Sequence, residues 1–257
     1  MSEVIKNPWT ELRRLTAARI ALGRAGASLP TAAHLDFQFD HARARDAVHR
    51  PLDADAVEAV LRGHTLDVVR AHSAAPDRAT YLQRPDLGRR LDDSSRTALR
   101  PNPCDLALVV ADGLSSFAIE NNVGPFLASL LPMLGGFSLG PVALALQGRV
   151  ALGDEIGAAL QAKAVIVLIG ERPGLSSPDS MGLYLTWAPQ KGRTDADRNC
   201  ISNIRPEGLS FDAAARKTVY LLNEARRLAY SGVRLKDETD ADGLTLAREA
   251  RPELSAT

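Results

Sequence analysis

The sequence predicts an α/β fold: a Rossmann-like, mostly parallel sheet flanked by helices and preceded by a smaller helical N-terminal domain. Between residues 106 and 170, short apolar runs of strand length alternate with longer helical segments. The run Ala-Val-Ile-Val-Leu-Ile-Gly at 164–170 is apolar on both faces, which is typical of a central parallel strand. Pro101-Asn-Pro103 separates this region from a more charged one before it, so we expect a domain boundary there.

Residues 1–100 form the predicted helical domain. A first helix is expected from Asn7 or Thr10 to about residues 23–26, and a second begins at Asp53, which is a good N-cap. The second helix is expected to break at Gly63 and to resume through Val69. Residues 32–49 alternate like a strand at first and then like a helix, so their structure stays open.

Residues 101–240 form the predicted Rossmann-like domain. Its expected strands are 106–111, 141–146, 164–170 and 181–187, and its expected helices are 116–134, 154–162 and 211–230. Pro125 and Pro132 should kink or split the first of these helices. Residues 192–199 are polar and predict a loop, and residues 241–257 predict a flexible tail.

Composition excludes several classes of partner. The chain of 257 residues has 31 basic and 31 acidic side chains, so we expect neither nucleic acid nor an anionic membrane as a ligand. No apolar run approaches the ~20 residues that a membrane span needs. Two distant cysteines and the lack of an apolar leader favour a cytoplasmic protein with reduced thiols. No His/Cys cluster has the spacing of a metal site.

Common catalytic and cofactor motifs are absent. The chain has no G-x-G-x-x-G after a strand, no phosphate-binding G-x-x-x-x-G-K-[ST] loop and no G-x-S-x-G nucleophile elbow. All five histidines precede residue 73, so a serine triad built within the predicted α/β domain would lack its base. We therefore expect no catalytic residue in this chain.

Three polar stretches follow predicted strands or lie in loops on the same side of the sheet: 148–150, 171–177 and 197–205. Each residue also has a purely structural explanation: Cys200 as an inert buried thiol, Glu171 in a salt bridge with its neighbour or with Arg205, and Asn199 and Asn203 in turns. If the stretches converge on one rim, they make a site for a large, amide-rich or hydroxylated ligand.

Several strings in these stretches resemble a known family. Residues 148–157 (GRVALGDEIG), 165–175 (VIVLIGERPGL) and 198–204 (RNCISNI) are similar to the small subunit of ethanolamine ammonia-lyase. Residues 7–15 and 35–46 fit the same family. The resemblance covers most of the chain, from about Trp9 to Gly232.

The resemblance implies an enzyme that uses adenosylcobalamin to convert ethanolamine to acetaldehyde and ammonia by a radical route. A TIM-type large subunit would carry the chemistry, and the small subunit would close over the cofactor. Family cofactor contacts fall on Val150, Glu171 and Cys200. A corrin has many amide arms, so Glu171 would accept hydrogen bonds, Val150 would offer backbone groups and a methyl wall, and Cys200 would be a packing contact.

The resemblance also raises the question of the cobalt ligand. The Asp-x-His-x-x-Gly motif that supplies a histidine to cobalt in some cobalamin enzymes is absent, so we expect cobalt to keep its own base. Packaging into a bacterial microcompartment stays open, since few residues precede Pro8. Two alternatives remain: a stand-alone dinucleotide-binding oxidoreductase and a cofactor-free interaction module.

Overall fold

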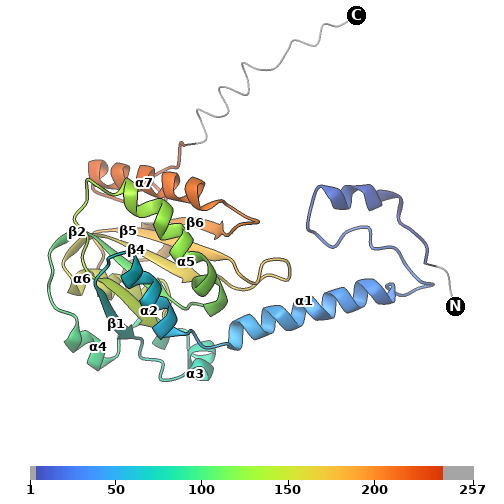
Figure 1. Cartoon of the computed structure of the whole chain (residues 1–257), viewed down its shortest axis with the longest axis horizontal. Helices are drawn as coiled ribbons and strands as arrows, with labels where there is room; N and C mark the ends of the chain where they lie inside the picture. The colour runs from blue at the N-terminus through green and yellow to red at the C-terminus, as the bar shows by residue number, and fades with distance from the viewer. Residues whose placement is uncertain (1–3, 240–257) are drawn as a thin grey trace, which may run out of the picture.

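The computed structural model describes residues 4–239 and contains one mixed α/β sheet (Figure 1). Its six strands lie in the order β1-β3-β2-β4-β5-β6. They are β1 (Val68–His72), β2 (Cys104–Ala111), β3 (Val142–Leu146), β4 (Ala162–Gly170), β5 (Met181–Trp187) and β6 (Arg198–Ile204). The first four are parallel to one another, whereas β5 runs antiparallel to both β4 and β6. The prediction of a mostly parallel sheet with helices is confirmed.

Both faces of the central strands are buried, which explains their continuous apolar sequences. On one face, Leu106, Leu108 and Val110 of β2 join a core with α2 (Ala54–Gly63), α5 (Ser116–Leu130) and α7 (Phe211–Leu228). On the other face, Ala107 and Val109 pack with α6 (Leu152–Ala159) and with Leu91 and Leu99. These last two leucines flank α4 (Asp93–Ala98), in the segment that also holds α3 (Arg78–Gln83) and the 3-10 helix η2 (Leu87–Arg89).

Side-chain caps set the starts of three helices, and the predicted N-cap Asp53 is confirmed. The side chains of Asp53, Ser115 and Ser210 cap α2, α5 and α7. Helix α5 continues through Pro125 but ends at Leu130, and the 3-10 helix η3 (Leu131–Met133) that follows contains Pro132. The predicted split of this helix is therefore confirmed at its second proline.

Three predictions about local structure were wrong. The expected first helix is only a 3-10 helix, η1 (Pro8–Arg14), although Asn7 does cap it. Val69 lies in β1 and not in a helix, because Thr65 takes a positive φ of 61° after α2 and the chain then pairs with β3. The sheet thus crosses the domain boundary predicted at residue 100. The polar stretch 198–204 is strand β6, preceded by the 3-10 helix η4 (Asp195–Asp197).

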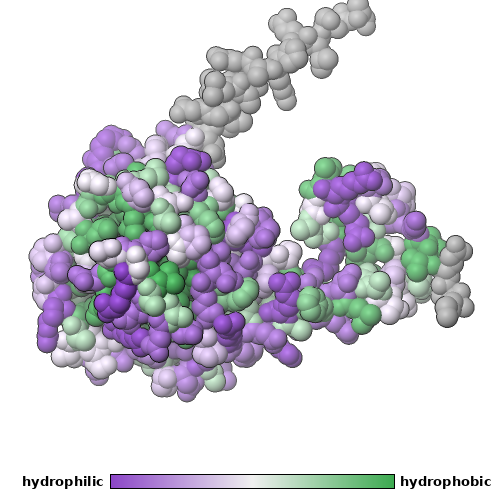
Figure 2. All heavy atoms as spheres, in the orientation of Figure 1, coloured by the Kyte–Doolittle hydropathy of each residue, from purple (hydrophilic) through white to green (hydrophobic). Residues whose placement is uncertain are grey.

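The N-terminal residues form an arm that projects from this body (Figure 1). The open segment 32–49 is helical, in α1 (Thr31–His49), and only Ala47 of that helix is buried. Most of the exposed large apolar side chains of the described residues lie on this arm, including Trp9, Leu15 and Phe39. Figure 2 shows separate hydrophobic patches on the arm, interspersed with hydrophilic side chains. The predicted tail at 241–257 lies outside the described residues.

Candidate functional site

The carboxyl ends of β2 and β3 mark the switch point of the sheet. The two strands are neighbours, but β2 leads to α5 on one face and β3 leads to α6 on the other. Connections that leave in opposite directions open a crevice, and ligands of open α/β sheets bind there. The residues at this point are 112–115 after β2 and 147–151 after β3.

The start of α5 is closed off by the end of β4. Leu114 N–H donates to Gly170 O at 2.9 Å, and Gly113 has a φ of +57°. A Cβ on Gly113 would lie 2.2 Å from Gly170 O, and one on Gly170 would lie 2.0 Å from Ser115 O. The glycines therefore serve backbone-to-backbone packing between the start of α5 and the end of β4.

A cavity of about 390 Å³ opens beside this contact. Its walls include Tyr81, Arg149, Val150, Ile169, Glu171 and Tyr184. Two of the three predicted contact residues, Val150 and Glu171, thus share one cavity. Cys200 does not line it, but it pairs with Tyr184 across β5 and β6. The structure therefore places Val150 and Glu171 in one cavity at the carboxyl edge and Cys200 two strands away from β4, beside the cavity residue Tyr184.

Among the described residues, the face of β5 and β6 next to this cavity is only partly covered. Helix α6 packs against β4 and β2, while Tyr184 and Cys200 stay partly or largely exposed. The Glu171 side chain folds back over the same strands, since a Cβ on Gly182 would lie 2.8 Å from its Oε1. Glu171 and Tyr184 therefore line the cavity, and the exposed Cys200 lies beside Tyr184 on the neighbouring strand.

Glu171 joins the end of β4 to both antiparallel strands. Its carboxylate accepts hydrogen bonds from the hydroxyls of Ser180 and Ser202 and, at 3.2 Å, from Asn203 N–H. The salt bridge to Arg205 that could have explained Glu171 does not form, because Arg205 pairs with Asp179 at 3.0 Å. A carboxylate has about four acceptor positions, and the protein itself uses three of those of Glu171.

Cys200 is exposed, so the explanation as a buried thiol was wrong. Desolvation by neighbouring atoms nevertheless raises the pKa of the thiol, and a hydrogen bond with Tyr184 only partly opposes this shift. Desolvation also raises the pKa of Tyr184. Both groups are therefore neutral at pH 7, which fits a packing role and not a nucleophile.

Buried hydrogen bonds hold the loop that carries Val150. The Asp112 carboxylate is buried and accepts from Gly113 N–H and Gly148 N–H, each at 3.0 Å. Tyr81 Oη–H donates to Gly148 O at 2.9 Å. Arg78 donates to Asp112 at 3.2 Å and, through Nε, to Val48 O at 2.8 Å. Sequence reasoning missed Tyr81 and Arg78, because nothing in the 78–91 segment marks it as part of the site.

The rest of the polar stretch 197–205 is structural. Arg198 is buried and makes two hydrogen bonds of 2.7 Å to Asp154 at the start of α6. The Asn199 amide binds backbone atoms of Gly232 and Leu235. Asn203 has a φ of +61° inside β6, where the register against β5 shifts, and its backbone O accepts from Leu209 N–H at 2.7 Å. The structural explanation of these two asparagines is therefore sufficient.

One histidine does reach the carboxyl edge, because β1 belongs to the sheet. His72 ends β1, and its Nδ1 lies 2.7 Å from Ser73 O. His72 lines neither the cavity described here nor a second, adjoining cavity whose walls include Arg89, Arg149 and Arg193. Within residues 4–239, no three His, Cys, Asp or Glu side chains are arranged to hold a metal ion. No helix in the same range combines the length and apolar character needed to cross a bilayer.

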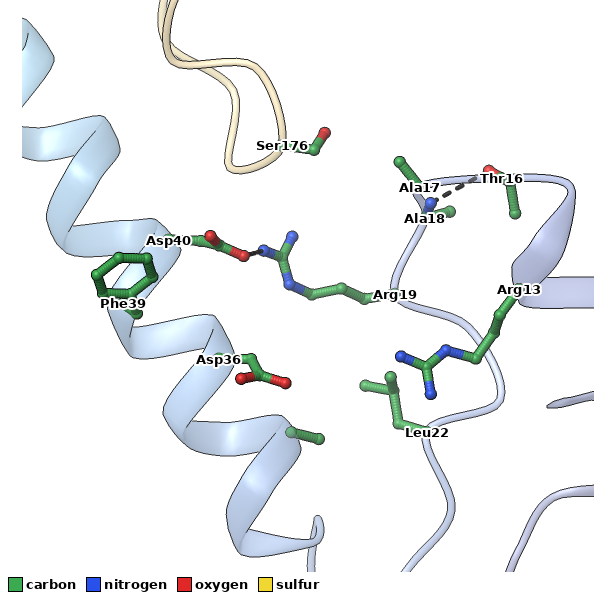
Figure 3. A pocket seen from close by; sticks show the side chains of 11 residues that line it. Arg13, Thr16, Ala17, Ala18, Arg19, Leu22, Asp36, Phe39, Asp40 and Ser176 are labelled. Carbon is green, nitrogen blue, oxygen red and sulfur yellow. Dashed lines mark hydrogen bonds and ion pairs between the residues drawn. The ribbon is translucent and has the colours of Figure 1, made fainter. Parts of the chain in front are cut away.

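A separate hollow of about 370 Å³ lies on the N-terminal arm, between α1 and the loop at residues 16–22 (Figure 3). It contains two arginines and two aspartates, and Arg19 pairs with Asp40. Ser176 of the body lies opposite them. Its charges balance within the arm, so this hollow offers a charged ligand little attraction.

Comparisons with known proteins agree with the resemblance. The family model for the ethanolamine ammonia-lyase light chain matches residues 6–236. A protein of Azotobacter vinelandii named ethanolamine ammonia-lyase small subunit is 59% identical, over 93% of this chain and 92% of that protein. A protein of the same name from Xanthomonas campestris is 58% identical, over 96% and 94% of the two chains. One from Pseudomonas fluorescens is 56% identical, over 95% and 92%.

Proposed function

The chain belongs to the ethanolamine ammonia-lyase light-chain family, and on that premise we propose that it binds part of adenosylcobalamin against a large catalytic subunit. The complete enzyme would convert ethanolamine to acetaldehyde and ammonia. The observation that carries this proposal is the cavity shared by Val150 and Glu171, whose wall residue Tyr184 is the cross-strand neighbour of Cys200.

The residues present fit a corrinoid. Such a ligand is a broad ring with neutral amide arms, and it needs acceptors for N–H groups together with apolar walls. Glu171 supplies a carboxylate acceptor, while Val150, Ile169 and Tyr184 supply the walls. The Nε of Arg149 is buried and has no hydrogen-bond partner among the described residues, so a donor in the cavity wall remains free.

The size of the cavity argues for a shared site. A volume of about 390 Å³ suits one drug-sized ligand, and adenosylcobalamin is several times larger than such a ligand. This chain can therefore enclose only part of the cofactor, and a second subunit must cover the rest. The parallel half of the sheet, with helices on both faces, supports a Rossmann-like description of the binding region.

In this proposal the chain binds and orients but does not catalyse. When bound, the cofactor supplies the radical that starts the reaction. Glu171 accepts a hydrogen bond from an amide arm or a ribose hydroxyl, Val150 and Tyr184 exclude water from one side, and Cys200 packs as a neutral thiol. None of these groups moves a proton in the reaction.

We further propose that cobalt keeps its own base as lower ligand. No histidine lines either cavity of this region in the described residues, and Nδ1 of His72 lies 2.7 Å from the backbone O of Ser73. An EPR spectrum of the Co(II) state, recorded with small subunit labelled with ¹⁵N-histidine, tests this. Coupling to ¹⁵N would show that a histidine of this chain had replaced the base.

The assembled enzyme is expected in the cytoplasm, and packaging into a microcompartment remains an open alternative. The balance of 31 basic and 31 acidic residues supports neither nucleic acid nor membrane as a partner. The large subunit is thus the one macromolecular partner that we propose.

Co-expression with a large subunit, followed by titration of the purified complex with adenosylcobalamin, tests the function. Loss of one charged hydrogen bond in Glu171→Gln should weaken binding by about 1.5–3 kcal/mol. The control Glu207→Gln alters a glutamate whose side chain is 69% exposed, and it should leave affinity unchanged. If the chain were a cofactor-free interaction module, Glu171→Gln would leave the affinity of the complex for adenosylcobalamin unchanged. Binding of a nicotinamide dinucleotide by the small subunit alone would favour the oxidoreductase.

A further inference from the structure

A second cavity, of about 420 Å³, adjoins the first and is unusually rich in arginine. The two cavities share Arg149, Val150 and Tyr184 as wall residues. The second also contains Arg89, Arg193 and Arg198, against a single carboxylate, Asp195. Nothing in the binding of neutral amide arms requires such a concentration of positive charge.

Not all of these arginines are available to a ligand. Arg198 is committed to Asp154 by two hydrogen bonds, and Arg193 lies 3.7 Å from Asp197. By contrast, neither Arg89 nor Arg149 has a carboxylate within salt-bridge distance in the described part of the chain. These two are therefore the uncompensated charges of the cavity.

Arg149 is held in place without being neutralised. Its guanidinium stacks on the Tyr81 ring at 4.3 Å, and its Nη2 makes one long hydrogen bond, 3.4 Å, to Tyr81 O. Gly88 allows this packing, since a Cβ there would lie 2.9 Å from both Arg149 Cγ and the Tyr81 ring. The Nε of Arg149 is buried and has no hydrogen-bond partner among the described residues 4–239. A stacked guanidinium with free donors is already oriented to bind an oxyanion.

The backbone next to Arg149 adds to the positive potential. Val150 and Ala151 immediately precede α6, where the helix dipole is positive. Neither Val150 N–H nor Ala151 N–H donates to an atom of the described residues. Asp154 and Glu155 in the first turn are occupied, by Arg198 and by Leu91 N–H at 2.9 Å. The cavity thus presents two arginines and two free backbone donors together.

We propose that this cavity binds a phosphate ester, with Arg149 and Arg89 as its cationic contacts. On the function proposed above, the ester is the phosphodiester of the cofactor's nucleotide tail. Arg149 then stands between the two cavities, so the tail lies in the second while the ring and its amide arms lie over the first. The same contacts could bind free inorganic phosphate, so the experiment must distinguish free phosphate from the phosphodiester of the tail.

The test compares aquacobalamin with aquacobinamide, a corrinoid that lacks the nucleotide tail and its phosphate. Binding to the small-subunit and large-subunit complex is followed by visible absorbance. Arg149→Met should weaken aquacobalamin binding about ten- to a hundredfold, the loss expected for a charge-assisted contact, and change aquacobinamide binding less than about threefold. Arg89 is exposed, so its replacement should not disturb folding. Arg89→Met should weaken aquacobalamin binding by a smaller factor and again leave aquacobinamide binding nearly unchanged.

The matched control is Arg216→Met, an exposed arginine on α7 at the opposite face of the sheet, which should affect neither ligand. Equal losses for both corrinoids, or none, would overturn the phosphate assignment while leaving the proposed function intact. A wild-type complex that binds neither corrinoid would refute the proposed function itself. A further outcome separates free phosphate from the nucleotide tail. In that outcome, ³¹P line broadening shows that inorganic phosphate binds through Arg149, while Arg149→Met keeps the wild-type ratio of aquacobalamin to aquacobinamide affinity. The cavity then serves free phosphate, and the tail assignment is wrong.

Discussion

Asp112→Asn should be one of the most destabilising isosteric changes in this chain. The residue is 2% exposed, and its carboxylate accepts from two backbone N–H groups while facing the Arg78 guanidinium at 3.2 Å. An amide can keep the two backbone bonds only if its NH₂ group faces Arg78. Arg78 already has an unpartnered buried Nη2, so its charge would then lose the carboxylate that balances it. Breaking a buried pair in this way costs about 3–5 kcal/mol, a large part of the ~5–15 kcal/mol that typically holds a domain folded.

Urea unfolding of the small subunit, followed by far-ultraviolet circular dichroism, measures this cost. Asp55→Asn is the control, because that side chain is 87% exposed and its pair with Arg70 should contribute less than about 1 kcal/mol. Arg78→Met removes the other charge, and the double variant should be more stable than the sum of the two single losses predicts. A cost below about 1 kcal/mol for Asp112→Asn, or strict additivity in the double variant, would refute the reasoning.

Two further predictions concern stability. Hydrogen bonds from Ser138 N–H and then from Lys163 lower the pKa of Asp105 to about 2. The folded pKa of Asp105 lies below its unfolded pKa, so the stabilisation is complete above about pH 4 and is lost as pH falls towards 2. Asp105→Asn should remove about 1–2 kcal/mol of this pH-dependent stability. Urea midpoints measured across this pH range would then fall less steeply in the variant than in the wild type. Gly170→Ala should cost more than about 3 kcal/mol in thermal or urea unfolding, since its Cβ would meet backbone at 2.0 Å, whereas Gly63→Ala, with open space around it, should be neutral or stabilising by up to about 1 kcal/mol. Equal effects of the two glycine variants would contradict the packing described for Gly170.

The buried strands could be predicted because their sequences are continuously apolar. Strands β2 and β4 lie between two helical layers, so almost every residue in them is apolar. Such a run can be recognised from a single sequence. Strand β6 could not be predicted in the same way. Only one of its faces is covered, and the register shift between Met181 and Leu183 of β5 breaks the alternation that places Ile201 and Ile204 inward.

The site was predicted in part for a similar reason. Val150 and Glu171 follow strands that the sequence identifies, so their meeting at one edge follows from parallel topology. Tyr81 and Tyr184 reach the cavity from a helix and from the middle of β5, positions that carry no sequence signal for an edge. The cofactor contacts themselves stay predictions, since the geometry brings the residues together without testing what they bind.

Arg78 gives the arm and the switch point a common support. Its Nε holds Val48 near the end of α1, and its Nη1 holds the carboxylate that in turn fixes Gly148. Three hydrogen bonds therefore connect the last turn of α1 to the turn that leads into Val150. A shift of α1 relative to the body would have to break or stretch one of them, so the position of the arm and the conformation of this turn are coupled.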